Sequence, residues 1–196
     1  MFTLGATTSR KGIKMEGIYT PRLILTTLDE NAAGDVLDFY LENPEFEDFE
    51  PQRPYNFYTY EQMAKTLKYE KDVMKRSLGM RYWIFEQESP YKIIGTVSFQ
   101  NFLISVYHSC QIGYKIHKDY QKMGYATEAV RAACEEIFEE FDIHRIEALT
   151  MPVNEPSKKV LKKAGFLYEG LAREKALIKN VWEDHEVYSL IKSDIL

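Results

Sequence analysis

The sequence has few cysteines, the residues that form the stabilising disulfide bonds of small extracellular proteins. Its 196 residues contain two cysteines, Cys110 and Cys134, which stand far apart and outside any C-x-x-C spacing. Neither a disulfide framework nor a zinc site is indicated, and a reducing cytoplasm suits this cysteine usage. The four histidines also lack the spacing of metal ligands, so we expect no metal ion.

Long apolar runs and a basic excess are missing too. No apolar stretch reaches the roughly 18 residues of a membrane span, and the first 17 residues do not resemble a signal sequence. The 25 Lys and Arg against 30 Asp and Glu give a net charge of -5. Sequence-independent binding of nucleic acid needs a basic excess instead. We therefore expect a cytoplasmic protein with no direct nucleic-acid or membrane partner.

The residues that are present have the composition of a folded domain. Hydrophobic residues make up 45% and charged residues 28%, values near the average of globular proteins. A chain of this length fits one domain. Residues 1–17 lack apolar periodicity, so we expect a flexible tail there and a single domain over residues 18–196.

Apolar spacing and turn residues predict the order of helices and strands. The expected elements are a strand at 18–28, helices at 29–41 and 60–77, strands at 80–86, 93–102 and 107–116, a helix at 125–141, a strand at 145–151, a helix at 154–164, and strands at 166–174 and 182–191. The order β-α-α-β-β-β-α-β-α-β-β predicts an α/β (α+β) fold with a mixed central sheet and helices on both faces, because a three-strand meander interrupts the alternation.

A short polar turn precedes the helix expected at 125–141. The turn reads Gln121-Lys122-Met123-Gly124-Tyr125-Ala126, which has the pattern Q-x-x-G-x-A. The start of a helix leaves about four backbone N–H groups unpaired, and small residues let a phosphate approach them. The pattern indicates a pyrophosphate site, although an ordinary strand-to-helix turn built for packing has the same residues.

A second motif, Asn154-Glu155-Pro156-Ser157, starts the short helix that Gly165 ends. Taken alone, this motif is explained by local helix structure: Asn154 is a helix cap, and proline is tolerated in the first turn. In this order and at this separation, however, the two motifs resemble the GCN5-related N-acetyltransferase superfamily, and within it the Rim-type branch. The resemblance runs from about residue 19 to residue 188. It also rests on residues 19–23, 49–51 with Arg53, 94–95, 108–114, 143–146, 165–166 with 169–170, and 182–185.

The resemblance implies a site for acetyl-coenzyme A as co-substrate, with no metal. The strands at 107–116 and 145–151 would part, and the backbone of the first would hold the pantetheine arm like an added strand. The polar turn would hold the pyrophosphate, and Ser157 would lie near the thioester sulfur. The implied cofactor-binding residues are Tyr114, Lys115, Ile116, Gln121, Lys122, Met123, Gly124, Tyr125, Ala126, Thr127, Asn154 and Ser157.

The catalytic residues depart from the common superfamily pattern. Gln111 stands where many members carry a glutamate that acts as a general base, and Leu161 stands where many carry a tyrosine that acts as a general acid. The Rim-type branch implies Ser157 as the donor to the leaving sulfur. A branch member's glutamate on the following strand matches Ala176, and Glu174 is two residues away, so Glu174 is the candidate base. Water relayed to Glu174, to His108 or to an acid of the 45–50 loop is the hypothesis for deprotonation.

Direct transfer to an amine requires no covalent enzyme intermediate. Cys110 lacks the base and orienting partner of a nucleophile, so we expect it to pack in the core. An α-amine with a pKa of roughly 7.7–8.0 needs only about 1–1.4 kcal/mol to be neutral at pH 7, whereas a lysine needs about 5. A chain without an obvious base therefore suits an α-amine.

The acidic loop at 42–54 is the expected acceptor site. Phe46, Phe49 and Glu50 would line a rim that attracts a basic acceptor, although such a loop is often only a solvated face. The expected acceptor is a protein or peptide N-terminus, such as that of a ribosomal protein, and the enzyme is expected to be a monomer or homodimer. The alternatives are a small-molecule amine acetyltransferase and a non-catalytic module that binds acyl-coenzyme A.

Overall fold

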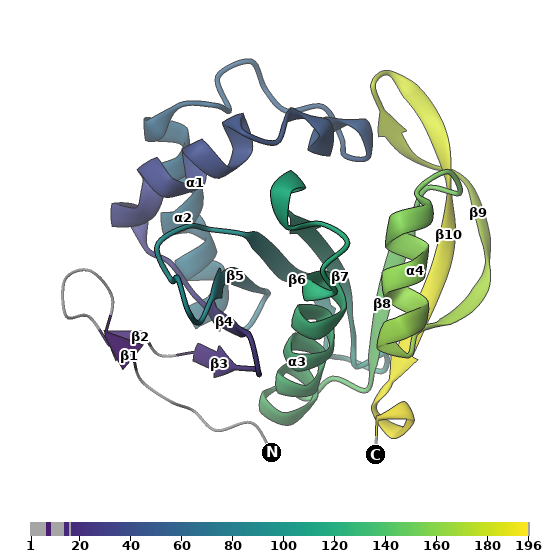
Figure 1. The fold of residues 1–196 in the computed structure, drawn as a ribbon. Helices are drawn as coiled ribbons and strands as arrows, with labels where there is room; N and C mark the ends of the chain where they lie inside the picture. The colour runs from purple at the N-terminus through teal and green to yellow at the C-terminus, as the bar shows by residue number, and fades with distance from the viewer. Residues whose placement is uncertain (1–6, 9–13, 16, 196) are drawn as a thin grey trace.

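One eight-stranded sheet forms the centre of the computed structural model, which describes residues 7–8, 14–15 and 17–195 (Figure 1). The strands lie in the order β3-β4-β5-β6-β7-β8-β10-β9, and every neighbouring pair is antiparallel except β7 and β8. They are β3 (Gly17–Tyr19), β4 (Leu23–Thr26), β5 (Met80–Glu86), β6 (Gly95–Leu103), β7 (Ser109–Ile116), β8 (Arg145–Thr150), β9 (Leu167–Ile178) and β10 (Val181–Ile191). The mixed sheet predicted from the sequence is confirmed.

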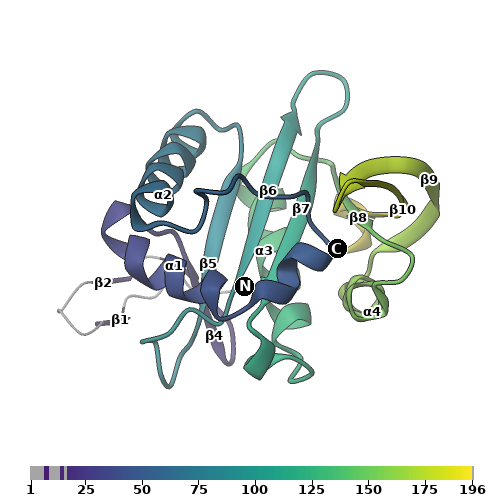
Figure 2. The same ribbon diagram turned by 90° about the horizontal axis from the view of Figure 1, so that it is seen from above.

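In the described part of the chain, four α-helices cover the two faces of this sheet (Figures 1 and 2). They are α1 (Ala33–Leu41), α2 (Tyr60–Lys75), α3 (Tyr125–Glu140) and α4 (Glu155–Ala164). Side chains alternate between faces along a strand. On β4, Leu23 and Leu25 accordingly join the core with α3 and α4, whereas Ile24 joins a second core with α1 and α2. The prediction of helices on both faces is confirmed.

The helix ends follow local rules of capping. Thr59 begins α2, and its hydroxyl accepts the N–H of Gln62 at 3.2 Å. Asn154 begins α4 in the same way, as the sequence predicted. Gly165 ends α4 with a φ of 98°, a left-handed conformation that glycine adopts without steric cost.

The N-terminal strand differs from the prediction. Residues 18–28 do not form one strand, because β3 turns back and pairs with β4. Pro21 lies in the turn, where its missing N–H costs nothing. The hydroxyl of Thr20 accepts the N–H of Leu23 at 3.0 Å and closes the turn. The single strand was therefore wrong, and a β-hairpin takes its place.

The expected tail at 1–17 lies mostly outside the described residues. Within it, β1 (Thr7–Thr8) pairs antiparallel with β2 (Lys14–Met15), and Gly17 already belongs to β3. A single domain over 18–196 stays a prediction. In the part of the chain that the structure describes, no helix is long and apolar enough to cross a membrane.

Candidate active site

The parallel strands β7 and β8 pair over only four residues of each strand. Their ladder runs from Ser109 opposite Arg145 to Ile112 opposite Ala148. Strand β7 continues to Ile116 with β6 on its other edge, and the two strands part toward the top of Figure 1. Within residues 17–195, the β8-facing edge of residues 113–116 therefore has no partner strand. The expected parting of the strands is present, and an extended ligand with amide groups could pair with this edge.

The side chain of Tyr114 links β7 to the start of α4. It stands two residues beyond the end of the ladder, and its hydroxyl reaches the first turn of α4. There the phenol oxygen lies within hydrogen-bond distance of two atoms of Ser157, the carbonyl oxygen at 3.0 Å and the hydroxyl at 2.9 Å. Sequence reasoning named Tyr114 for its backbone alone and missed this contact.

The start of α4 is held firmly in place. The side-chain oxygen of Asn154 accepts the N–H of Ser157 at 3.2 Å. Lys158 donates to the carbonyl of Pro152 at 2.7 Å and pairs with Glu186 of β10 at 3.4 Å. The position of Ser157 is therefore fixed relative to the sheet. The structure uses Asn154 as a helix cap, and its role toward a pantetheine arm stays a prediction.

Thr150 carries a buried hydroxyl at the same parting of the strands. Its side chain is 3% exposed, and among the described residues its Oγ1 has no hydrogen-bond partner. Continuing the β7–β8 register by two residues would place Thr150 opposite Tyr114. A buried polar atom without a partner is costly. Thr150 is therefore a candidate ligand-binding residue that the sequence motifs did not indicate.

The polar turn before α3 presents its backbone to solvent. Gly124 caps α3 with a φ of 83°, and Lys122 has a φ of 62°. The first helical hydrogen bond runs from the N–H of Glu128 to the carbonyl of Gly124. The N–H groups of residues 125–127 precede that bond and are free to bind an anion, which the positive end of the helix dipole also favours.

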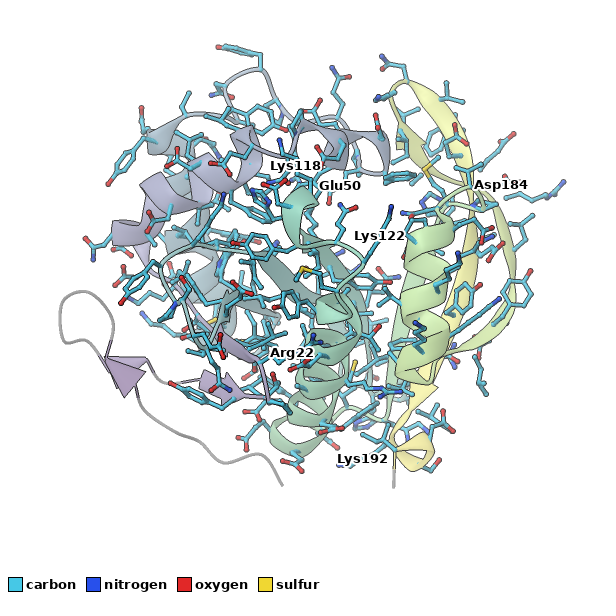
Figure 3. All side chains as sticks on the ribbon, viewed as in Figure 1. Arg22, Glu50, Lys118, Lys122, Asp184 and Lys192 are labelled. Carbon is cyan, nitrogen blue, oxygen red and sulfur yellow. The ribbon has the colours of Figure 1, made fainter. Side chains whose placement is uncertain are left out.

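Arg22, in the turn between β3 and β4, holds this turn from the side (Figure 3). Its guanidinium donates to the carbonyl of Met123 at 2.9 Å and to the carboxylate of Glu128 at 2.7 Å. Thr20 also donates to Glu128, at 2.6 Å. Partial burial would raise the pKa of Glu128, but the bonds from Thr20 and Arg22 hold it below its ordinary value. Sequence reasoning assigned no role to Arg22, although it lies in one of the stretches that carry the family resemblance.

The acidic loop at 42–54 (the acidic segment) packs against α1. Residues Pro44–Asp48 form a short 3-10 helix. Within it the ring of Phe46 packs on Phe39, with 5.4 Å between centroids, while Phe49 is 42% exposed. Of the three residues expected to bind substrate, Phe46 thus serves core packing, and Phe49 is free to contact an acceptor.

Glu50 ties the acidic segment to β7 (Figure 3). Its carboxylate pairs with Lys115 at 2.5 Å and with Arg53 at 2.7 Å. Burial would raise the pKa of Glu50, but Lys115 and Arg53 lower it below its ordinary value. Lys115 was expected to act through its backbone; its side chain has this second, structural use. Because Glu50 is paired twice, it is a poor proton acceptor.

The base candidates do not gather at Ser157. Glu174 is exposed on the edge strand β9, and its N–H donates to Asp184 at 2.8 Å. Among the described residues, no hydrogen bond links Glu174 to Ser157. His108 precedes β7 and contacts Asp142, so by the rise of a strand it lies about 20 Å from Tyr114. Glu174 as base stays a prediction, and His108 lies too far away.

Cys110 is a core residue. It is 1% exposed, and burial raises the pKa of its thiol to about 12. A neutral buried thiol is a poor nucleophile, so its expected packing role is confirmed. The neighbouring Gln111 accepts a hydrogen bond from Asn101 at 2.8 Å. Over the described ranges, no three His, Cys, Asp or Glu side chains come together in a way that could hold a metal ion.

Comparison with known proteins agrees with this geometry. The model of the acetyltransferase (GNAT) domain family matches residues 22–167. A probable N-acetyltransferase of Bacillus subtilis, YjcK, is 36% identical over 93% of this chain and 98% of its own length. The alanine N-acetyltransferase of ribosomal protein uS5 from Escherichia coli is 29% identical over 94% and 95%. The crystal structure of a ribosomal-protein-S5-alanine acetyltransferase from Vibrio fischeri superposes with a TM-score of 0.84, at 29% identity over 90% and 96%.

The parted parallel strands and the open helix start agree with the family that the matches identify. The chain belongs to the GNAT acetyltransferase family and is an N-acetyltransferase. Its relatives include two proteins that are named as alanine acetyltransferases of a ribosomal protein. The family resemblance found in the sequence is therefore confirmed.

Proposed function

We propose that this enzyme transfers the acetyl group of acetyl-coenzyme A to the N-terminal α-amine of a protein in the cytoplasm, such as a ribosomal protein. The observation that carries the proposal is the contact between Tyr114 and Ser157 where β7 and β8 part. It puts a hydroxyl donor beside an open strand edge. The names of two relatives, which specify a ribosomal-protein alanine, support the acceptor.

The residues present fit acetyl-coenzyme A. The free edge of residues 114–116 suits the amides of a pantetheine arm, and the buried hydroxyl of Thr150 offers one more hydrogen bond. The N–H groups after Gly124 suit the pyrophosphate, with the charge of Lys122 nearby on the same turn. When bound, the co-substrate supplies an acetyl group activated as a thioester.

The chemistry asks little of the protein beyond positioning. The amine nitrogen bonds to the acetyl carbon, the carbon–sulfur bond breaks, and the nitrogen releases one proton to Glu174 or to water. Ser157 donates a hydrogen bond to the departing sulfur. Because an α-amine is partly neutral at pH 7, Glu174 or water completes the deprotonation. A Glu174→Gln variant that keeps full turnover would remove Glu174 from this role.

The acceptor enters from the side of the acidic segment. Lys179, at the tip of the β9–β10 hairpin, pairs with Asp48 at 2.5 Å and ties the hairpin to that segment. The exposed ring of Phe49 lies on the same segment. Its acidic residues attract a basic N-terminus, so added salt should raise the KM for such an acceptor.

The test compares matched acceptors in an assay of coenzyme A release. One basic peptide has a free N-terminal alanine, and the other is N-terminally blocked but contains lysine; a polyamine and a reaction without acceptor complete the set. We expect release only with the free N-terminus. Release with the polyamine alone would make the enzyme a small-molecule acetyltransferase, and coenzyme A binding with no release for any acceptor would refute the proposal.

A further inference from the structure

The phenol of Tyr114 has one proton and two acceptors on the same serine. Its oxygen lies 3.0 Å from the carbonyl oxygen of Ser157 and 2.9 Å from the hydroxyl. A phenol and a serine hydroxyl each donate one hydrogen bond and accept others. Two arrangements therefore exist. In the first, Tyr114 donates to the carbonyl and accepts from the serine; in the second, it donates to the serine hydroxyl, whose own proton is then free to point elsewhere.

The surroundings keep this pair protonated and in place. Burial raises the pKa of Tyr114 above its ordinary value, so its proton is present at physiological pH. The ring packs against the core under α3, and the cap by Asn154 holds the backbone of Ser157. Changing between the two arrangements therefore needs only rotation of two hydroxyl groups.

We propose that Tyr114 is a positioning residue: it donates to the hydroxyl of Ser157 and thereby directs the serine proton at the departing sulfur. The inference rests on the proposed function, in which Ser157 faces that sulfur. Hydrogen bonds in a chain strengthen one another by about 10–30% per bond, so a bond received from Tyr114 makes Ser157 a stronger donor. Neither Tyr114 nor Ser157 forms a covalent bond to the acetyl group. The sulfur leaves with the electron pair of the broken carbon–sulfur bond.

The first test uses coenzyme A alone and needs no acceptor. A free thiol has a pKa of about 8.5, and a hydrogen bond to the thiolate lowers that value. The thiol pKa of bound coenzyme A is measured from thiolate absorbance during a pH titration, with desulfo-coenzyme A as the blank. We expect a lowered pKa with the natural enzyme, a smaller lowering with Tyr114→Phe, and the smallest with Ser157→Ala. An equal pKa for the natural enzyme and Tyr114→Phe overturns the inference.

The second test separates kcat from KM. Tyr114→Phe should lower kcat about fivefold, the effect of one hydrogen bond, with little change in the KM for acetyl-coenzyme A. The double variant with Ser157→Ala should be no slower than Ser157→Ala alone, because Tyr114 acts through Ser157. Multiplied losses in the double variant, or an equal rise in KM, overturn the inference.

Tyr168→Phe is the matched control. Tyr168 lies exposed on β9, where its ring packs on Tyr188 with 5.5 Å between centroids, so this variant should keep the natural kcat. If the natural enzyme acetylates no amine, the proposed function fails, but the thiol titration still decides the role of Tyr114. If Ser157→Ala slows turnover and Tyr114→Phe does not, the role of Tyr114 alone fails.

Discussion

Replacing Thr150 by valine should change stability and binding in opposite directions. The Thr150 hydroxyl is buried and, within the described chain, without a partner. Such a group costs about 1–3 kcal/mol when it is left unsatisfied. Valine has nearly the same shape and suits a strand, so the free enzyme should gain about 1 kcal/mol in its free energy of unfolding. For a chain of this length that raises the Tm by about 2–4 °C.

The same change should weaken coenzyme A binding. If the hydroxyl bonds to the pantetheine arm, its loss costs about 1 kcal/mol of binding free energy, or about a fivefold rise in Kd. Titration calorimetry measures the Kd, and urea unfolding measures the stability of the free enzyme.

Thr96→Val is the matched control, because its buried hydroxyl is satisfied. It donates to the carbonyl of Tyr82 at 2.9 Å, so removing it should destabilise the enzyme by about 1 kcal/mol and leave the Kd unchanged. The reasoning is refuted if Thr150→Val destabilises the free enzyme as Thr96→Val does, or if the Kd of Thr150→Val equals the natural value.

Two further predictions concern ion pairs. Arg22→Met should loosen the turn before α3 and raise the Kd of coenzyme A about tenfold, because the hydrogen bonds of a charged group are lost. Pantetheine lacks the pyrophosphate, so its Kd should not change. An equal rise in Kd for both ligands would contradict the prediction. Lys115→Met should lower the free energy of unfolding by about 1–2 kcal/mol at pH 7, because the partly buried Glu50 loses one of its two charged partners and keeps Arg53. The exposed Lys71→Met should change it little. Folding lowers the pKa of Glu50, so its contribution to the free energy of unfolding is full above the ordinary pKa of 4.5 and is lost as the pH falls below that value. Urea unfolding at a series of pH values should show a smaller loss of stability at low pH for Lys115→Met than for the natural enzyme.

Local sequence rules predicted the elements that depend on neighbouring residues. Asn154 begins a helix and Gly165 ends it because caps act within a few positions. The hairpin of β3 and β4 was missed for a related reason. Apolar residues continue across Pro21, and the Thr20 bond that closes the turn leaves no periodic signal.

Contacts between distant segments could not be predicted from the sequence. The alternation along β7 places Tyr114 on the buried face with Cys110 and Ile112, but nothing local says that its hydroxyl ends at Ser157, 43 positions later. Glu50 looked like part of a solvated loop, because its partner Lys115 lies on another element. In both cases the partner is chosen by the packing of α4 or of the acidic segment against the sheet.

The place of the site follows from the one parallel pair in the sheet. A parallel connection needs a crossover, and here α3 supplies it between β7 and β8. The chain leaves β7 at its carboxyl end and enters α3 through the Gly124 turn; it leaves β8 at the same end and enters α4 near Ser157. Both helix starts therefore lie at the carboxyl ends of adjacent parallel strands, where open α/β sheets bind their ligands. Because the strands also part at that end, Tyr114 can reach Ser157 beside a free strand edge, and the hydroxyl pair and the turn before α3 lie at the two ends of one extended site.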